Sequence, residues 1–477
     1  MTAMAALRFF IDEIRFFERD VALRLPFRFG VATLTSCPQV HVQARIRFAD
    51  GSTMPGCAAE MLVPKWFDKN LALSNEDNFE QLRTALKLAR SAYTAEPVAH
   101  TAWGHFAAHY DAVLAAGAQA GLNPLVASYG PALIDRAVLD ALCLHLQCSF
   151  AQAMATNAAG MAPRDLDATR DLASLDIDAF LARRSPVTQI AARHTVGLLD
   201  AIGQADRPLD APDDGLPCTL AEVVARYGHR HFKLKLGGNA AVDLARLREI
   251  SNLIGARAQV VTLDGNEQYA DAAAFADFLD RFEAAPALAP LRARVVFVEQ
   301  PIRREQTLQC DVSALARRIP LLVDESDSTL RSFVQARAAG YTGISSKSCK
   351  GVYKSILNAA RCALWSAAEG KTYFQSGEDL TMQAGVGVQQ DLALVGWLGL
   401  AHVERNGHHY VNGMAALPAQ EQLAFQTAHP ALYETSAGAV RLHIRDGLID
   451  LHSLACPGFA TAKPGAGISW DAMRSAY

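Results

Sequence analysis

The sequence predicts an α/β protein built around a modified TIM barrel, a (β/α)8-type ring of parallel strands. From about residue 190 onward, short apolar runs with strand character alternate with helical stretches, as expected for a parallel sheet with helical crossovers. Eight such runs fall within roughly 210 residues, which fits a closed barrel of about 250 residues. The chain contains no G-x-G-x-x-G or G-x-x-x-x-G-K-S/T loop, so no motif favours an open, doubly wound sheet.

The N-terminal part has a different pattern and predicts a separate α+β unit. Strand patterns cover residues 8–25 and 40–48, and an Asp50-Gly51 hairpin turn follows. We expect residues 27–38 to form a loop, because the later part of this stretch is rich in small polar residues. Three segments with helical spacing follow, at residues 76–93, 102–118 and 131–155.

The barrel is expected to begin after this unit. Its eight strands are predicted at residues 195–199, 231–236, 259–264, 294–299, 321–324, 343–347, 371–375 and 401–404. Helices are predicted between nearly all of them, including 240–253, 272–282, 329–339, 353–368 and 391–400. The expected units are residues 1–155, residues 156–410 and a C-terminal segment, 411–477.

The C-terminal segment contains a hairpin pattern at residues 440–451, around Asp446-Gly447. We expect this hairpin to return to the N-terminal strands, because a closed barrel offers no free edge to pair with.

Composition indicates a cytoplasmic globular protein. Apolar residues make up 51% and charged residues 20% of the chain, the usual balance for a soluble fold. The net charge of −4 includes no block of like charges, so neither nucleic acid nor a membrane surface is expected as a partner. The nine cysteines are scattered without a C-x-x-C pair, which fits a reducing compartment. No signal-peptide core or membrane-spanning run is apparent, and the sequence leaves open whether the chain forms a homo-oligomer.

Charged residues stand at the ends of five consecutive predicted strands. They are Lys233 and Lys235, Asp264, Glu299, Asp324 and Lys347. The carboxyl ends of barrel strands meet on one rim, so these side chains are expected to converge. Three carboxylates brought together need a cation between them, and ligands that are all oxygen favour a hard ion such as Mg²⁺.

Each of these residues also has a simpler explanation. A single acid could cap a helix or lie in an exposed loop, and the two lysines could form the solvated face of an edge strand. Five such positions at successive strand ends favour the metal site, held by Asp264, Glu299 and Asp324. Glu325, beside Asp324, is the alternative third ligand.

These motifs together resemble the enolase superfamily, and within it the muconate-lactonizing-enzyme subgroup of the mandelate racemase/muconate lactonizing enzyme family. The matching segments are Phe232-Lys233-Leu234-Lys235, Asp264-Gly265-Asn266, Val298-Glu299-Gln300-Pro301, Asp324-Glu325-Ser326 and Lys347. The resemblance implies an N-terminal capping domain, completed by the C-terminal tail, above a barrel that holds Mg²⁺.

The chemistry that the resemblance implies is removal of the α-proton of a small carboxylate substrate to give a metal-stabilised enediolate. Lys235 and Lys347 would act as acid and base on opposite faces of the substrate carbon. Lys233 would lower the pKa of Lys235 and help to hold the carboxylate. The products could arise by racemisation or epimerisation, cycloisomerisation or β-elimination. A catalytically silent binding protein and a barrel metal hydrolase are the alternatives.

Two departures from the subgroup bear on the substrate. After Lys347 the chain has Cys349-Lys350-Gly351-Val352, with an extra cation where the subgroup usually has a glycine pair. Residues 402–409 lack the Asp-x-Asp with which dipeptide epimerases hold a substrate ammonium group. Expected substrate contacts are Asn266, Glu378 and Asp379. Specificity is expected to come from cap residues 33–36 and 60–67, whereas the insertion at 68–100 has no expected ligand.

Overall fold

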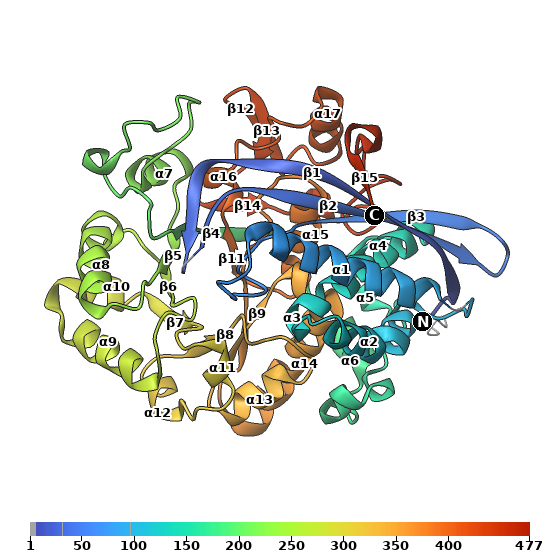
Figure 1. Ribbon diagram of the computed structural model, residues 1–477, viewed down its shortest axis with the longest axis horizontal. Helices are drawn as coiled ribbons and strands as arrows, with labels where there is room; N and C mark the ends of the chain where they lie inside the picture. The colour runs from blue at the N-terminus through green and yellow to red at the C-terminus, as the bar shows by residue number, and fades with distance from the viewer. Residues whose placement is uncertain (1–5, 31, 96) are drawn as a thin grey trace.

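The computed structural model describes residues 6–30, 32–95 and 97–477. It contains the predicted barrel of eight parallel strands, with each strand paired to the next and the last paired to the first (Figure 1). The strands are β4 (Gln189–Val196), β5 (His231–Lys235), β6 (Val260–Asp264), β7 (Val295–Glu299), β8 (Leu321–Val323), β9 (Gly343–Ser346), β10 (Phe374–Gly377) and β11 (His402–Arg405). The predicted fold class is therefore confirmed.

Helices follow most of these strands and cover the outside of the barrel. They are α7 (Leu220–Tyr227), α8 (Ala240–Ile254), α9 (Ala272–Ala284), α10 (Ala289–Arg292), α11 (Arg304–Thr307), α12 (Ser313–Ala316), α13 (Ser332–Ala338), α14 (Val352–Glu369), α15 (Val386–Trp397) and α16 (Gly407–Tyr410). None of the helices in the described ranges is both long and apolar enough to cross a membrane.

The first barrel strand lies earlier than predicted, at Gln189–Val196 instead of residues 195–199. The strand contains Arg193 and His194, which are both buried. Charged and polar residues are seldom buried without partners, and a prediction from apolar runs therefore passes over this strand. The partners of these two buried side chains come from distant parts of the chain.

The N-terminal domain combines an antiparallel sheet with helices. Its strands are β1 (Phe9–Phe29), β2 (Ala32–Phe48) and β3 (Thr53–Met61), in the order β15-β1-β2-β3, where β15 is Arg474–Ala476. Its helices are α1 (Asn75–Thr94), α2 (Ala102–Gln119), α3 (Pro124–Ala127), α4 (Tyr129–His145) and α5 (Phe150–Ala155), and α6 (Ile177–Ala182) follows. In Figure 1 the long strands β1 and β2 extend from these helices toward the barrel.

The loop predicted at residues 27–38 is wrong, because β1 and β2 continue through it as a paired ribbon. Phe27 pairs with Leu34, and Phe29 pairs with Ala32. Phe27, Phe29 and Leu34 are buried, whereas the polar residues between them are exposed. This alternation marks a strand with one buried face. Residue 31 of the predicted loop lies outside the described residues.

The helix predicted at residues 131–155 is two helices, α4 and α5. Ser149 begins α5 with a capping box, in which its hydroxyl accepts from the Gln152 backbone and the Gln152 side chain accepts from the Ser149 backbone. Capping satisfies the first N–H groups of a helix locally, so a new helix begins at this point.

The tail prediction is right for the last strand and wrong for residues 440–451. β15 pairs with β1 and completes the cap sheet. β12 (Tyr433–Ser436) and β13 (Ala439–Leu442) form a separate hairpin, preceded by α17 (Ala419–Ala428). β14 (Leu448–Asp450) pairs with the start of β4 in the barrel. β4 begins at Gln189, but its pairing with β5 begins only at Arg193. The four residues before Arg193 therefore have a free edge with which β14 can pair.

Asp140 of α4 joins the cap to the C-terminal segment. Its buried carboxylate accepts from the backbone N–H of Cys57 at 2.8 Å and of Phe459 at 2.8 Å, and from the Thr461 hydroxyl at 2.5 Å. Burial raises the pKa of Asp140 to about 6, against the lowering effect of these donors.

This raised pKa predicts a dependence of stability on pH. Between about pH 4 and pH 6 the folded state retains a proton that the unfolded state has lost, so stability falls as the pH rises. Over that window, the free energy of unfolding should fall by about 2 kcal/mol more in the wild type than in Asp140→Asn. Urea unfolding at both pH values measures this difference, and parallel curves for the two proteins would contradict it.

Candidate active site

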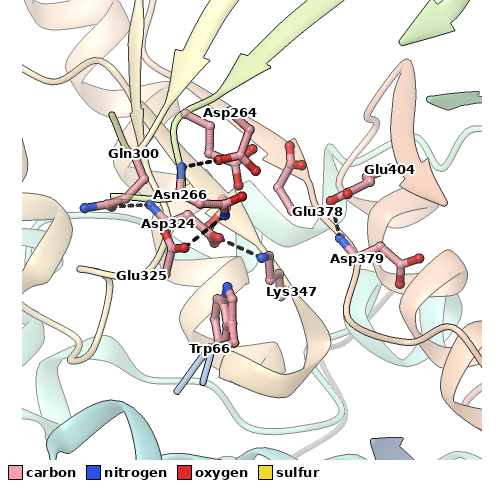
Figure 2. Close-up of polar contacts among 12 residues, drawn as sticks. Trp66, Asp264, Asn266, Gln300, Asp324, Glu325, Lys347, Glu378, Asp379 and Glu404 are labelled. Carbon is pink, nitrogen blue, oxygen red and sulfur yellow. Dashed lines mark hydrogen bonds and ion pairs between the residues drawn. The ribbon is translucent and has the colours of Figure 1, made fainter. Parts of the chain in front are cut away.

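The carboxyl ends of the barrel strands bring the predicted charged residues onto one rim. Parallel pairing places Lys235 beside Asp264, and Asp264 beside Glu299. Asp324 and Lys347 directly follow β8 and β9. All five side chains are buried, and Figure 2 shows Asp264, Asp324 and Lys347 pointing toward one another.

Lys233 lies at the centre of this rim, where its ammonium group contacts four carboxylates. Its Nζ lies 2.7 Å from Glu299 Oε2, 2.7 Å from Glu378 Oε2, 2.9 Å from Asp264 Oδ2 and 3.0 Å from Glu404 Oε2. Burial disfavours the charged form, but the four acids together outweigh it and raise the pKa of Lys233 well above its usual value. Lys233 is therefore a charged group that holds the acids together.

Lys235 and Lys347 come from opposite walls of the barrel. Their strands, β5 and β9, are separated by three strands in either direction around the ring. Lys235 Nζ donates to Asp264 Oδ2 at 2.6 Å, and Lys347 Nζ donates to Asp324 Oδ2 at 2.6 Å. Burial opposes the charge on Lys347, but the attraction of Asp324 and other acids raises its pKa above the usual value.

The cap places an aromatic ring beside each of these lysines. The Trp66 ring centroid is 4.3 Å from Lys347 Nζ, and the Phe27 ring centroid is 6.0 Å from Lys235 Nζ. Figure 2 shows Trp66 next to Lys347. Such rings attract an ammonium group and exclude water from it. Trp66 belongs to the segment 60–67 in which specificity is expected.

The backbone behind the acids adopts a sparsely populated conformation. Asn266 and Gln300 have φ values of 40° and 34°, in the left-handed region that costs a residue with a side chain about 1–3 kcal/mol. The Asn266 N–H donates to Asp264 Oδ1 at 2.8 Å, and Gln300 Oε1 accepts from the Asp324 N–H at 2.9 Å. Each residue thus positions one acid. The Asn266 amide also donates to Glu325 Oε1 at 3.2 Å.

Lys350, the extra cation after Lys347, lies beside Asp324. Its Nζ donates to Ser345 Oγ at 2.6 Å and lies 3.5 Å from Asp324 Oδ1 and 3.0 Å from Asp327 Oδ2. Burial disfavours the Asp324 carboxylate, but Lys347 and then Lys350 outweigh burial and lower its pKa. Asp324 therefore faces two lysines.

The strands β10 and β11 supply the remaining acids. Glu378 and Glu404 both contact the central lysine, and Glu378 also pairs with the buried Arg193 of β4. Asp379 is turned away from them in Figure 2. Its carboxylate pairs with Arg405 at 2.9 Å, and its N–H donates to Glu404 Oε2 at 2.9 Å.

Glu404 and Arg193 are site residues that the sequence did not reveal. Glu404 lies in the eighth barrel strand next to its last residue, so the strand-end rule applied there would have found it. Arg193 lies in the strand whose position was predicted too late in the chain. No local pattern distinguishes an arginine with a buried partner from one in solvent.

The acids fit a hard divalent cation by their chemistry. Asp264, Glu299 and Asp324 are fully buried oxygen donors. Within the described residues, the Lys233 ammonium group, 2.7 Å from Oε2, is the one polar partner of the Glu299 carboxylate, and burial followed by repulsion from Asp264 and Glu378 raises the pKa of Glu299 well above its usual value. Such a carboxylate needs additional positive charge.

The spacing of these acids is nevertheless not that of a compact ligand set. Lysine ammonium groups lie between the carboxylates. Within residues 6–30, 32–95 and 97–477, the one group of histidine, cysteine or acidic side chains with ligand atoms within 4.8 Å of one another is His194, His229 and His408. A cation at the acids would therefore have to compete with Lys233 for Asp264 and Glu299.

A cavity of about 500 Å³ opens beside the rim, between the cap and the barrel. Lys69 and Asn123 line it from the cap, and Arg304 and Glu325 line it from the barrel. Lys69 Nζ also donates to the Asn266 carbonyl at 2.5 Å. The insertion at 68–100, which had no expected ligand, thus contributes to the wall of a cavity next to the predicted metal site.

Solved structures of known proteins resemble this fold. The muconate lactonizing enzyme of Pseudomonas fluorescens matches with a TM-score of 0.57 and 18% identity, over 94% of this chain and 95% of that chain. An N-succinyl Arg/Lys racemase of Bacillus cereus matches with a TM-score of 0.59 and 16% identity, over 94% of each chain. The L-Ala-D/L-Glu epimerase of Bacillus subtilis matches with a TM-score of 0.55 and 16% identity, over 94% and 98%.

These identities establish a common fold and leave the reaction open. No match was found among curated proteins. The family model described as "Enolase C-terminal domain-like" matches residues 218–474, more than half of the chain. The chain therefore belongs to the enolase C-terminal domain-like family, within the mandelate racemase/muconate lactonizing enzyme group of the enolase superfamily.

Proposed function

We propose that this chain is a Mg²⁺-dependent enzyme that removes the α-proton of a small carboxylate substrate. The observation that carries the proposal is the placement of Lys235 and Lys347 on opposite walls of the barrel, with the acids of β6, β7 and β8 between them. Two amines facing one carbon from both sides can remove a proton from one face and return it to the other.

Each residue has a separate task in this proposal. Asp264, Glu299 and Asp324 would hold Mg²⁺, which when bound stabilises the negative charge of the substrate carboxylate as the proton leaves. Lys233 also pairs with Glu378 and Glu404, so it would keep two acid partners if Asp264 and Glu299 held the cation. Its charge would then help to hold the substrate carboxylate.

The two lysines would exchange the proton. Lys235 would take the α-proton at its Nζ, and its ion-pair partner Asp264 is one of the acids that would hold the cation. Lys347 would give a proton to the opposite face from its ammonium group, the form that pairs with Asp324 in this structure. Trp66 and Phe27 limit access of water to both groups.

We expect the cavity lined by Lys69 and Arg304 to limit the size of the substrate. The cavity borders Glu325, the neighbour of Asp324, so the part of the substrate beyond its carboxylate would extend into it. Its lining includes cations, amides and acids, which favours a polar distal group. Racemisation or epimerisation and β-elimination begin with this proton transfer, and cycloisomerisation includes it as its first or last step, according to the direction of the reaction.

Exchange of the α-proton in D₂O tests the proposal directly. A library of small carboxylic acids is incubated with the protein and Mg²⁺, and deuterium at the α-carbon is measured by mass spectrometry. At least one acid should exchange with Mg²⁺ present and should stop exchanging with EDTA. A hydrolase would release products without deuterium at carbon, and a binding protein would retain ligand without exchange. Either outcome would reject the proposal.

A further inference from the structure

Three buried histidines lie on the outer side of the barrel wall. In β4, Arg193 and Thr195 point inward, where they contact Glu378 and Glu404. His194 lies between them in sequence and therefore points outward. His229 lies two residues before the start of β5, and His408 lies in α16, after β11. Within the barrel, β5 and β11 lie on either side of β4, so the three histidines come from adjoining segments.

One ring nitrogen of each histidine points to a common centre. His408 Nε2 is 3.0 Å from His194 Nδ1 and 3.2 Å from His229 Nε2. All three ligand nitrogens lie within 4.8 Å of one another. Bonds of about 2.0–2.1 Å to a tetrahedral zinc ion place nitrogen atoms about 3.3 Å apart. The observed separations are close to that spacing.

A hydrogen bond to the backbone identifies the nitrogen of His229 that carries a lone pair. His229 Nδ1 lies 3.0 Å from the Ala192 carbonyl oxygen. A carbonyl only accepts, so Nδ1 carries the proton and His229 Nε2 presents a lone pair to the centre. Without a metal, a single proton on His408 Nε2 would have to form hydrogen bonds to both His194 and His229. A cation at the centre would instead accept a lone pair from each of the three nitrogens.

The surroundings keep these rings neutral, which is the form that binds metals. Burial, followed by repulsion among neighbouring histidines, lowers the pKa of His194 and His408 well below the usual value. Burial lowers that of His229 to about 4. The nearby ionisable groups include His409, whose ring centroid is 5.2 Å from that of His194, and Tyr227, whose ring centroid is 5.0 Å from that of His408. His231 also acts on His229 and lowers its pKa further.

We propose that His194, His229 and His408 form a second metal site, which binds a zinc-type divalent cation through three imidazoles. Imidazole ligands suit zinc and related transition metals, whereas Mg²⁺ requires oxygen ligands. The site is separate from the acids inside the barrel. Three protein ligands leave the fourth tetrahedral position to water or a small anion.

The bound cation would connect segments that carry the active site. It would link three segments: the residues just before β5, the strand β4, and the helix α16 after β11. β5 holds Lys233 and Lys235, and β11 holds Glu404. These connections depend on no acid of the rim, so zinc should stabilise the protein whether or not Mg²⁺ is present. The melting temperature is expected to rise by a few degrees with saturating Zn²⁺.

Metal analysis of the untagged, full-length protein tests the site. After dialysis with excess Mg²⁺ and no chelator, the protein should retain about one zinc ion per chain. Co²⁺ in its place should give the visible absorption of a tetrahedral site with nitrogen ligands. His408→Gln should weaken zinc binding by more than about 100-fold, since loss even of a supporting partner costs up to that factor.

Two control variants separate this site from other metal sites in the protein. His429→Gln removes a buried histidine of the C-terminal segment, and Glu299→Gln removes a rim acid; both should retain the zinc and the Co²⁺ spectrum. The proposal is rejected if wild-type protein holds no zinc at micromolar concentrations. It is also rejected if His408→Gln, checked for folding by circular dichroism, binds zinc as tightly as the wild type. Either result would leave a hydrogen-bonded histidine cluster.

Discussion

Replacing Lys235 by methionine is expected to lower the rate of α-proton exchange by about 10²–10⁴-fold. Methionine fills most of the buried volume of the lysine stem but has no group that accepts a proton. Within the part of the chain that the structure describes, Asp264 is the one acid that forms an ion pair with the Lys235 ammonium group. The rate is measured by deuterium incorporation from D₂O with the best acid from the exchange library.

Lys347→Met provides the mirror-image experiment. The two lysines approach from opposite walls, so each variant should lose exchange at its own face of the substrate carbon. With a racemisable substrate, Lys347→Met should still exchange the enantiomer whose proton faces Lys235, yet should form little of the other enantiomer. Lys371→Met is the control, because its side chain is 67% exposed and lies before β10. Unchanged exchange in both rim variants would refute the assigned roles.

Arg136→Met is expected to lower the free energy of unfolding by about 3–5 kcal/mol, the cost of removing one partner from a buried ion pair. Arg136 of α4 lies 3.2 Å from Glu60 Oε2 of β3, and both side chains are 0% exposed. Glu60 also accepts from the Ser348 hydroxyl at 3.0 Å and the Thr381 hydroxyl at 2.7 Å. The variant would leave this carboxylate charged, buried and without its cation.

The double variant Glu60→Gln/Arg136→Met tests that explanation. Ser348 and Thr381 donate to different Glu60 oxygens. Glutamine removes the charge, keeps an oxygen acceptor for one hydroxyl and offers an N–H to the other, so the double variant should be more stable than Arg136→Met alone. Midpoints of urea unfolding give both values. A loss below about 1 kcal/mol in Arg136→Met would mean that Glu60 is already neutral or solvated. A double variant less stable than the single one would contradict the buried-charge explanation.

The barrel and most of its charged rim could be predicted from the sequence, because both depend on local patterns. Short apolar runs such as Val260–Asp264 are strands by their own composition. A charged residue at the end of each run, such as Asp264 or Glu299, lies on the rim in any barrel of this kind. The barrel topology therefore determines where on the rim each strand-end residue lies.

Other elements could not be predicted, because their burial depends on partners far along the chain. Arg193 is buried in β4 beside Glu378, 185 residues away, so β4 has no apolar run that would place it. The tail strand β14 pairs with β4 only because β4 extends beyond β5. The continuation of β1 and β2 through residues 27–38 depends on the burial of Phe27 and Phe29 within the folded protein.

The sequence by itself determined the family, the parallel barrel and the identity of the lysines and acids at the strand ends. Only the tertiary structure decided how these charges are paired. It placed Lys233 among four carboxylates and gave Asp324 a second lysine, Lys350. It also brought His194, His229 and His408 together. Ion pairs and ligand sets depend on distances between residues remote in sequence, and local patterns carry no information about those distances.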